Sequence, residues 1–229
     1  MHPLSKKKHC SNAVLHMTNN PKKNHGNTPD CTSDQDWLDP VFLRTHFENK
    51  SILIGISGGI AVYKVCTIVS RLAQAGAQVT VAMTPAATKF VNPITFQALS
   101  GNPVYTSSWE HVESKDPQHI SLADRCDAAM VVPCTMNTLA NLVHGQTNDV
   151  VTLILSAVVR EKVPVLLAPA MNDAMWNQPS TQRNVRLAEE DGFTLVGPGH
   201  GWQACRHTGT GRMSEPESCI QAIAQALGS

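Results

Sequence analysis

Residues 169–176, Pro-Ala-Met-Asn-Asp-Ala-Met-Trp, form the segment whose residue types most clearly suggest chemistry. Two methionines and a tryptophan make a soft apolar wall, and Asn172 adds one polar group to it. Such a surface suits a flat, partly apolar ligand and a single polar substrate group. The segment follows an apolar run, residues 163–168, that predicts a buried strand. Because open α/β sheets bind ligands beyond the ends of their strands, we expect a binding site here.

A glycine-rich turn at residues 55–60, Gly-Ile-Ser-Gly-Gly-Ile, lies between a predicted strand and a predicted helix. Backbone N–H groups at the positive end of that helix favour a phosphate. The turn lacks the GxGxxG pattern, and the next strand ends in Met83-Thr84 without an acid for an adenosine ribose. The segment therefore disfavours a dinucleotide and favours a mononucleotide such as FMN, with a plain tight turn as the alternative.

Residues 133–138, Pro-Cys-Thr-Met-Asn-Thr, follow the third predicted strand and open another helix. Thr135, Asn137 and Thr138 offer short hydroxyl and amide groups that can cap this helix and can also bind a phosphate or a flavin. Capping alone is the alternative interpretation of this cluster.

Two further residues are candidates for proton transfer. His119 opens a predicted helix after a polar loop, and a nearby helix N-terminus favours the neutral, basic form of its ring. Cys205 stands beside Arg206 and His207 in residues 199–213, where four glycines predict a mobile flap. A cysteine in such surroundings can act as an acid or as a thiolate. An ordinary surface histidine and a free surface thiol are the alternatives.

Strands and helices alternate through residues 49–229, which predicts an α/β fold with a doubly wound, mostly parallel sheet, a Rossmann-like, flavodoxin-type three-layer sandwich. Hydrophobic patterns place strands at residues 51–56, 78–83, 128–132, 163–168 and 193–196. One predicted helix begins near residue 61. Further helices are predicted at residues 93–100, 119–125, 135–144, 149–160, 179–190 and 215–227. Gly76 and Gly192 are expected to end helices, and Ser214 to cap the last one.

The chain divides into three parts by composition. Residues 1–35 are rich in polar residues and poor in large apolar ones, so we expect a disordered N-terminal extension. Residues 36–48 are expected to form a short lead-in helix anchored by Trp37, Leu38, Phe42 and Leu43. Residues 49–229 hold the folded domain with all the candidate segments.

Bulk composition argues against several classes of function. The formal net charge of zero gives no support to binding of nucleic acid or of an acidic membrane surface. The 7 cysteines form no CxxC pair, so neither a disulfide framework nor a zinc site is indicated, and we expect a reducing compartment. No apolar run reaches the ~18 residues that a membrane span needs, and no secretory signal is recognised.

Taken together and in chain order, these segments resemble the flavin-containing cysteine decarboxylases, most closely the bacterial phosphopantothenoylcysteine decarboxylases. The resemblance covers about residues 50–228. The matching motifs are Ser57-Gly-Gly-Ile60, residues 133–138, residues 169–176, His119-Ile-Ser-Leu122, and Cys205 followed by Gly209-Thr-Gly-Arg-Met213. Two positions depart from the family, whose members often have an acidic residue at the position of Ser121 and an aromatic residue near Cys126.

The resemblance implies an FMN-dependent carboxy-lyase of coenzyme A biosynthesis that converts 4'-phospho-N-pantothenoylcysteine to 4'-phosphopantetheine and carbon dioxide. His119 would be the general base, Asn172 would bind the carboxylate, and Cys205 would donate a proton in the final reduction. No metal is implied. The residues expected to contact FMN are Ser57, Gly58, Gly59, Ile60, Thr84, Thr135, Asn137, Thr138, Ala170 and Met171.

The resemblance also implies a cytoplasmic homotrimer, or an assembly of trimers, with FMN between subunits and with neither nucleic acid nor a membrane as partner. Because the chain ends after the decarboxylase part, the synthetase that makes the substrate is expected on another chain. The alternatives are a decarboxylase of C-terminal peptidyl cysteine, a flavin-dependent prenyltransferase, a non-catalytic regulatory flavoprotein, and a nucleotide-binding module without flavin. The flap with Cys205 argues against the first two, and the intact His119, Asn172 and Cys205 argue against the third.

Overall fold

The computed structural model describes residues 39–110 and 117–228. The predicted N-terminal extension and the predicted anchors Trp37 and Leu38 lie outside the described residues. Among the residues described, no helix combines the length and the apolar composition that crossing a membrane requires.

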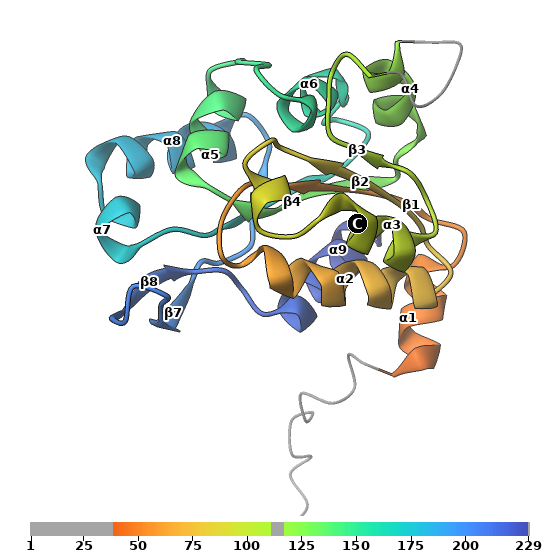
Figure 1. Cartoon of the computed structure of the whole chain (residues 1–229), viewed down its shortest axis with the longest axis horizontal. Coiled ribbons are helices and arrows are strands. Elements are labelled where there is room, and N and C mark those ends of the chain that lie inside the picture. Colours follow the sequence, from red (N-terminus) through yellow and green to blue (C-terminus); the bar gives the residue numbers. More distant parts are fainter. Residues whose placement is uncertain (1–38, 111–116, 229) are drawn as a thin grey trace, which may run out of the picture. The chain divides into compact units, whose positions relative to one another are not determined.

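The core of the domain is a six-stranded sheet in which all neighbouring strands run parallel (Figure 1). Its strands are β1 (Ser51–Ile56), β2 (Gln78–Met83), β3 (Val104–Tyr105), β4 (Ala128–Cys134), β5 (Val165–Pro169) and β6 (Thr194–Leu195). Their order is β3-β2-β1-β4-β5-β6, so the chain runs from β1 to one edge and then resumes at β4 toward the other. This order confirms the predicted doubly wound α/β fold and places the switch point between β1 and β4.

Helices cover both faces of the sheet and complete three layers (Figure 1). One face carries α1 (Pro40–Phe47), α2 (Val62–Gln74), α3 (Pro93–Ser100) and α9 (Pro216–Leu227). The other carries α4 (Gln118–Arg125), α5 (Met136–Val143), α6 (Val150–Ala157) and α8 (Pro179–Glu190). Side chains of β1 alternate between two cores, since Ile52 and Ile54 pack on the first side and Leu53 on the second.

The lead-in helix α1 begins later than the predicted residue 36. The Asp39 carboxylate caps it by accepting the Val41 N–H at 3.0 Å, and Pro40 occupies its first turn. Leu43, a predicted anchor, is buried, and Phe47 at the end of the helix is fully buried. The helix therefore packs on the domain through its last two turns.

Several helix ends agree with the sequence prediction. Helices α3 and α8 cover the predicted residues 93–100 and 179–190. The Asn92 side chain begins α3 by accepting the Ile94 N–H at 3.2 Å. Gly76 and Gly192 follow α2 and α8 with φ values of 88° and 85°, in the left-handed region that ends helices. Both are confirmed as helix stops.

Other elements differ from the prediction. Ser214 does not cap α9, because its hydroxyl donates to the Val196 carbonyl at 3.0 Å and Glu215 occupies the cap position. The predicted strand at 193–196 is β6 but not the last strand. The chain continues into an antiparallel hairpin of β7 (Gly199–Trp202) and β8 (Thr208–Arg212). The short elements β3, η2 (Ala87–Lys89) and α7 (Asp173–Trp176) also carry no periodic signal, because each has too few residues to show one.

Candidate active site

The glycine-rich turn after β1 and the segment after β4 meet at the switch point of the sheet, because β1 and β4 are neighbours. Ser57 joins the two segments. Its hydroxyl donates to the Pro133 carbonyl at 2.7 Å and accepts the Thr135 N–H at 2.9 Å. Only 1% of Ser57 is exposed, so its side chain holds the two loops in register.

The start of α2 offers free hydrogen-bond donors. Within the part of the chain that the structure describes, the backbone N–H groups of Gly58, Gly59 and Ile60 have no hydrogen-bond partner. Ala61 precedes α2 without a side-chain cap. Unpaired N–H groups at the positive end of a helix are the donors that a phosphate needs. The turn therefore fits the phosphate end of a flavin mononucleotide.

Gly58 is the glycine on which the shape of this turn depends. A Cβ at Gly58 would lie 2.5 Å from Ala86 Cβ and 2.7 Å from the Ala86 carbonyl carbon, so the Gly58→Ala backbone must move. We expect this variant to lose ~1–3 kcal/mol of unfolding free energy. It should also bind flavin more weakly, because the N–H donors move with the backbone.

Gly59→Ala is the matched control for Gly58→Ala. A Cβ at Gly59 would meet nothing closer than Thr135 Cγ2 at 3.9 Å, so its unfolding free energy should stay within about 0.5 kcal/mol of wild type. Urea unfolding of the flavin-free proteins measures the first effect, and quenching of flavin fluorescence on titration measures the second. Equal unfolding free energies for the two variants would contradict the prediction.

The polar side chains after β4 differ in whether they already have hydrogen-bond partners. Thr135 caps α5, since its Oγ1 accepts the Thr138 N–H at 3.3 Å and donates to Thr138 Oγ1 at 3.1 Å. Asn137 is exposed, and its side-chain amide has no hydrogen-bond partner among the described residues. The hydroxyls of the two threonines are therefore engaged at the start of α5, while the amide of Asn137 is left unpaired among the described residues.

The remaining predicted flavin contacts follow neighbouring strands. Thr84 follows β2, is 6% exposed, and accepts an N–H of the next turn at 3.2 Å through its hydroxyl. Ala170 and Met171 follow β5, and their N–H groups donate to the Cys134 carbonyl and to β8, each at 2.9 Å. The structure thus places these residues at the carboxyl edge of the sheet, on either side of the switch point.

Asn172 begins α7 and has a fixed side-chain orientation. Its Oδ1 accepts the Ala174 N–H at 2.8 Å, which uses the amide oxygen as a cap. Its Nδ2 donates to the Cys205 sulfur at 3.1 Å. Because the capping bond demands an acceptor, the donor end of the amide must face the thiol. The structure therefore brings together two of the predicted catalytic residues, which are 33 positions apart in sequence.

The predicted flap is a β-hairpin that packs on α7. Arg206 N–H donates to the Gln203 carbonyl at 2.9 Å, and Gln203 N–H donates to the His207 carbonyl at 2.8 Å, which closes a tight turn around Cys205. A Cβ at Gly209 would lie 2.7 Å from Asp173 Cβ. The glycine content that predicts mobility also allows this close approach of β8 to α7.

Cys205 is the exposed thiol among the described cysteines. Burial raises the pKa of Cys126 to about 11, and those of Cys134 and Cys219 to about 12. Thiols in such positions stay protonated and inert. The exposure of Cys205 and its contact with Asn172 therefore set it apart.

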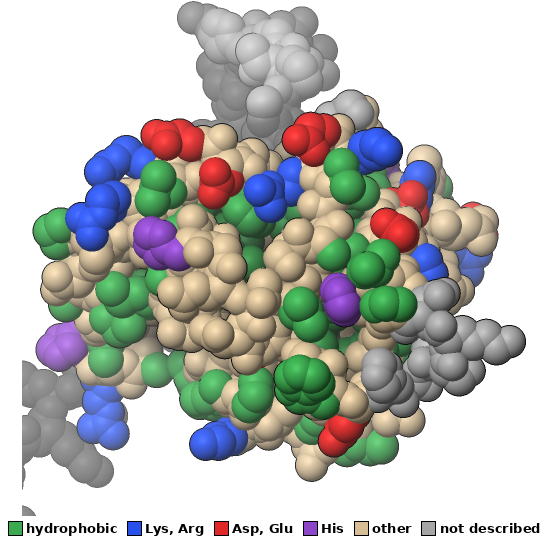
Figure 2. Space-filling model, turned by 90° about the horizontal axis from the view of Figure 1, so that it is seen from above, with side chains coloured by type: hydrophobic (Ala, Val, Ile, Leu, Met, Phe, Trp, Pro, Cys, Tyr) green, Lys and Arg blue, Asp and Glu red, His purple; other side chains and the backbone are tan. Residues whose placement is uncertain are grey.

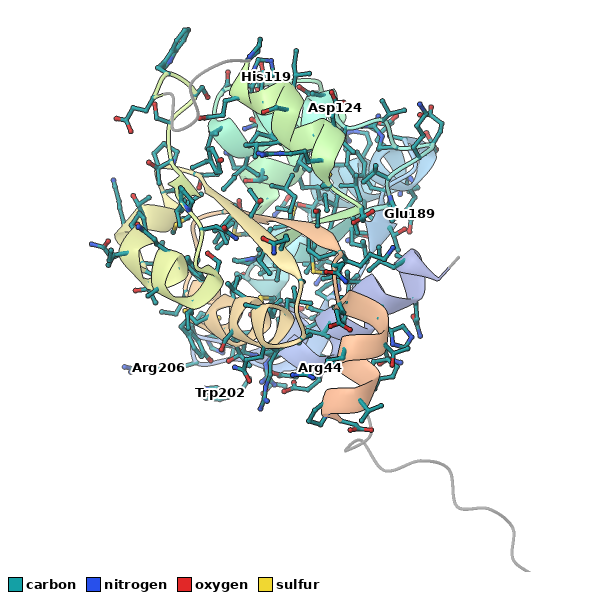
Figure 3. The ribbon with its side chains drawn as sticks, turned by 90° about the vertical axis from the view of Figure 1, so that its right-hand side faces the viewer. Arg44, His119, Asp124, Glu189, Trp202 and Arg206 are labelled. Atoms are coloured by element: carbon teal, nitrogen blue, oxygen red, sulfur yellow. The ribbon has the colours of Figure 1, made fainter. Side chains whose placement is uncertain are left out.

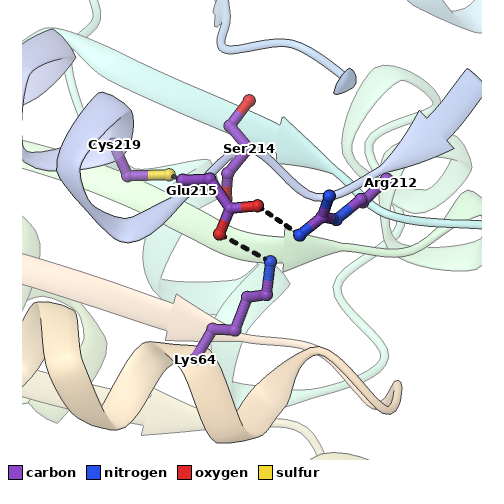
Figure 4. A network of polar contacts seen from close by, with 5 residues as sticks. All are labelled: Lys64, Arg212, Ser214, Glu215 and Cys219. Carbon is purple, nitrogen blue, oxygen red and sulfur yellow. Dashed lines mark hydrogen bonds and ion pairs between the residues drawn. The ribbon is translucent and has the colours of Figure 1, made fainter. Parts of the chain in front are cut away.

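The base of the hairpin is tied to both α2 and α9 through Glu215 (Figure 4). The Glu215 carboxylate pairs with Lys64 Nζ at 2.8 Å and with the Arg212 guanidinium. The hydrogen bond from Lys64 is the main cause that holds the pKa of Glu215 below its ordinary value of 4.5; burial opposes it, and the charges of Lys64 and Arg212 add to the lowering. The contribution of these pairs to stability is therefore complete above about pH 4.5 and is lost as the pH falls through the lower folded-state pKa.

We expect Glu215→Gln to lower the unfolding free energy near neutral pH by up to ~1 kcal/mol, since the carboxylate is half exposed and screened. The difference from wild type should shrink as the pH is lowered below about 4.5. Urea unfolding at about pH 7 and about pH 3.5 measures it, with Glu190→Gln at the exposed end of α8 as control. The prediction is wrong if the difference is the same at both pH values.

His119 lies apart from the other two catalytic candidates. It is the second residue of α4, which begins one residue earlier than predicted, and it is half-buried. Figure 3 shows His119 on the opposite side from Trp202 and Arg206 of the hairpin, and Figure 1 likewise separates α4 from β7 and β8. Among the described residues, no hydrogen bond joins His119 to Asn172 or Cys205. The structure of one chain does not bring the three together.

The surface around α4 is partly apolar. Figure 2 views the protein from the side of α4 and α6 and shows hydrophobic side chains spread over this face among charged ones. Trp109 is 90% exposed and Ile120 of α4 is 45% exposed. A partly open cavity of about 240 Å³ lies between α4 and β1–β3; Leu122 of the His119–Leu122 motif lines it, and none of the predicted catalytic or flavin-contacting residues does. Within residues 39–110 and 117–228, no cluster of three His, Cys, Asp or Glu side chains could hold a metal.

Comparison with known proteins identifies similar sequences. The family described as Flavoprotein matches residues 42–228. The coenzyme A biosynthesis bifunctional protein CoaBC of Bacillus subtilis is 42% identical over 173 residues, which are 76% of this chain and 42% of that protein. The chain thus spans less than half the length of that relative. The probable phosphopantothenoylcysteine decarboxylase of Streptococcus mutans is 38% identical over 178 residues, which are 78% of this chain and 99% of that protein.

Solved structures share the fold. A PPC decarboxylase mutant with cysteine replaced by serine, complexed with pantothenoylaminoethenethiol, superposes with a TM-score of 0.71 at 27% identity, covering 80% of this chain and 100% of that one. The FMN-dependent cysteine decarboxylase SpaF superposes with a TM-score of 0.66 at 28% identity, covering 79% of this chain and 97% of that one.

Proposed function

Because the chain belongs to the Flavoprotein family, we propose that it is an FMN-dependent carboxy-lyase that converts 4'-phospho-N-pantothenoylcysteine to 4'-phosphopantetheine and carbon dioxide in coenzyme A biosynthesis. The contact between Asn172 Nδ2 and Cys205 Sγ at 3.1 Å carries this proposal. It joins an amide donor that can hold a carboxylate to a thiol that can give a proton. Decarboxylation followed by reduction needs both groups at one carbon. The relative of matching length and the ligand of the PPC decarboxylase mutant support the same substrate class.

A bound FMN would supply the redox chemistry by taking up a hydride and returning it. The N–H groups of Gly58, Gly59 and Ile60 would hold its phosphate, since they are unpaired and lie at the start of α2. Asn137 would add an amide contact, and Ser57 would keep the two loops in register. The other residues proposed to line the flavin are Thr84, Thr135, Thr138, Ala170 and Met171.

The side chains of the protein would hold the substrate and move its protons. His119 takes the proton of the substrate thiol while a hydride leaves the adjacent carbon, which oxidises that carbon to a thioaldehyde. Asn172 holds the carboxylate while the carbon–carbon bond breaks, and the electron pair moves to sulfur, giving carbon dioxide and an enethiolate. Cys205 protonates the carbon that carried the carboxylate, and the hydride returns to the carbon bearing sulfur. The proton on His119 returns to sulfur and solvent reprotonates Cys205, so there is no net oxidation.

We further propose a homotrimer, or an assembly of trimers, with FMN between subunits. The separation of α4 from the hairpin supports this assembly, because a neighbouring chain would have to supply His119 to the pair formed by Asn172 and Cys205 (Figures 1 and 3). Exposed apolar residues beside α4 are suited to burial against that chain. We place the enzyme in the cytoplasm, with a small-molecule substrate and with neither nucleic acid nor a membrane as partner.

Purified protein reconstituted with FMN tests the proposed function. It should be yellow, release carbon dioxide from 4'-phospho-N-pantothenoylcysteine and form 4'-phosphopantetheine, as measured by gas trapping and mass spectrometry. A peptide ending in cysteine serves as the competing substrate. Preference for the peptide would support the peptidyl-cysteine alternative instead. Failure to bind FMN, or to release carbon dioxide from either compound, would overturn the proposal.

A further inference from the structure

Gln203 is a buried polar residue next to the proposed proton donor. It is 8% exposed, although it lies in the turn of the hairpin. Its Oε1 accepts the Asp173 N–H at 3.2 Å, and its Nε2 donates to the Thr210 carbonyl at 3.1 Å. Both partners are backbone groups of fixed polarity, so the amide of Gln203 can take only one orientation.

The fixed oxygen of Gln203 faces the thiol of Cys205. The sulfur lies 3.5 Å from Gln203 Oε1 and 3.1 Å from Asn172 Nδ2. An amide oxygen can only accept, so the S–H donates to Gln203, while the sulfur accepts from Asn172. Two side-chain amides thereby assign separate donor and acceptor roles to one thiol.

The same groups fasten the hairpin to α7. Asp173 Oδ1 accepts the Thr210 N–H at 2.8 Å, and Gln203 bridges the Asp173 N–H and the Thr210 carbonyl. A Cβ at Gly211 would clash with the Met171 carbonyl. The backbone of β8 therefore also packs directly against the backbone just before α7. The turn that carries Cys205 and helix α7, which Asn172 caps, therefore form one unit.

We propose that Gln203 is a positioning residue that orients the Cys205 thiol for the reductive half of the reaction. This inference rests on the proposed function. In that half, Cys205 gives its proton to the carbon that lost the carboxylate, the hydride returns to the carbon bearing sulfur, and solvent restores the thiol. Once carbon dioxide has left, Asn172 Nδ2 donates to the thiolate that Cys205 becomes. In this proposal Gln203 acts by directing the thiol proton and is assigned no contact of its own with the substrate or the flavin.

Two substitutions at Gln203 separate this role from mere attachment of the hairpin. Gln203→Met and Gln203→Glu both lose the Nε2 donor to Thr210, but only Gln203→Glu keeps an oxygen that can accept from Cys205 and Asp173. The readout is the ratio of released enethiol to 4'-phosphopantetheine. Carbon dioxide release is measured in the same assay. In assays open to air, where oxygen reoxidises the flavin that each released enethiol leaves reduced, we expect Gln203→Met to raise this ratio about tenfold, with carbon dioxide release and the substrate KM near wild type, and Gln203→Glu to stay near wild type.

An infrared measurement provides a readout that does not depend on turnover or on flavin. The S–H stretching band of Cys205 is isolated as the difference spectrum between each protein and its Cys205→Ser form. We expect this band at higher frequency in Gln203→Met, because the thiol loses its acceptor, and at the wild-type frequency or lower in Gln203→Glu, because a carboxylate oxygen accepts at least as strongly as an amide oxygen.

The outcomes separate the inference from the function on which it rests. A wild-type protein that releases no carbon dioxide overturns the proposed function. If wild type is active, an unchanged ratio and band in Gln203→Met overturn the inference. Equal shifts in Gln203→Met and Gln203→Glu also overturn it, because attachment of the hairpin would then explain the effect.

Discussion

Mixed oligomers of two inactive variants, His119→Asn and Asn172→Asp, are expected to regain decarboxylase activity. Each variant alone should lose turnover by about 100-fold or more, since one lacks the proposed base and the other the proposed carboxylate donor. Asn172→Asp keeps an oxygen for the cap of α7, so the fold around it should survive. In a mixed trimer whose sites combine His119 of one subunit with Asn172 of the next, one of the three sites is intact, so about a third of wild-type activity should return.

Coexpression with two affinity tags isolates the mixed oligomers, and trapped carbon dioxide measures their activity. The control is a mixture of the two separately purified variants, assayed before their subunits have time to exchange. Both single variants should remain yellow, because neither substitution removes a group that holds the phosphate. Mixed oligomers that stay as inactive as the single variants would show that each site lies within one chain.

The separation of His119 is a feature that sequence reasoning could not supply. The motifs that carry the candidate residues are local, and their order along the chain says nothing of the distance between α4 and the hairpin. Residues at the carboxyl ends of neighbouring parallel strands lie close together, which is why the segments at Ser57 and Thr135 meet. His119 instead is the second residue of α4, a helix of the outer layer whose position depends on packing against α6 and the sheet.

Contacts made by the hairpin are equally hidden in the sequence. Gln203 looks like any polar turn residue, and it becomes buried only because β7 and β8 fold against α7. Ser214 is the expected cap for α9, but its hydroxyl bonds the Val196 carbonyl, 18 residues away, and Glu215 occupies the cap position instead. In each case a hydrogen bond to a backbone group distant in sequence overrides the local conformational preference of the side chain. The sequence therefore predicts which loops form the site better than it predicts which atoms are left free for a ligand.

Cys205→Ser is expected to stop the reaction after decarboxylation. The serine hydroxyl holds its proton far more strongly than a thiol, so the enethiol should not be protonated and reduced. Without oxygen, the variant should release about one equivalent of carbon dioxide and enethiol per flavin and then lose its yellow colour, because the two electrons stay on the cofactor. Air should restore the colour and further turnover. Cys66→Ser, at a half-buried thiol of α2, is the control and should make 4'-phosphopantetheine normally. Normal product at full rate from Cys205→Ser, with the colour retained, would remove Cys205 from the mechanism and leave its contact with Asn172 as a purely structural bond.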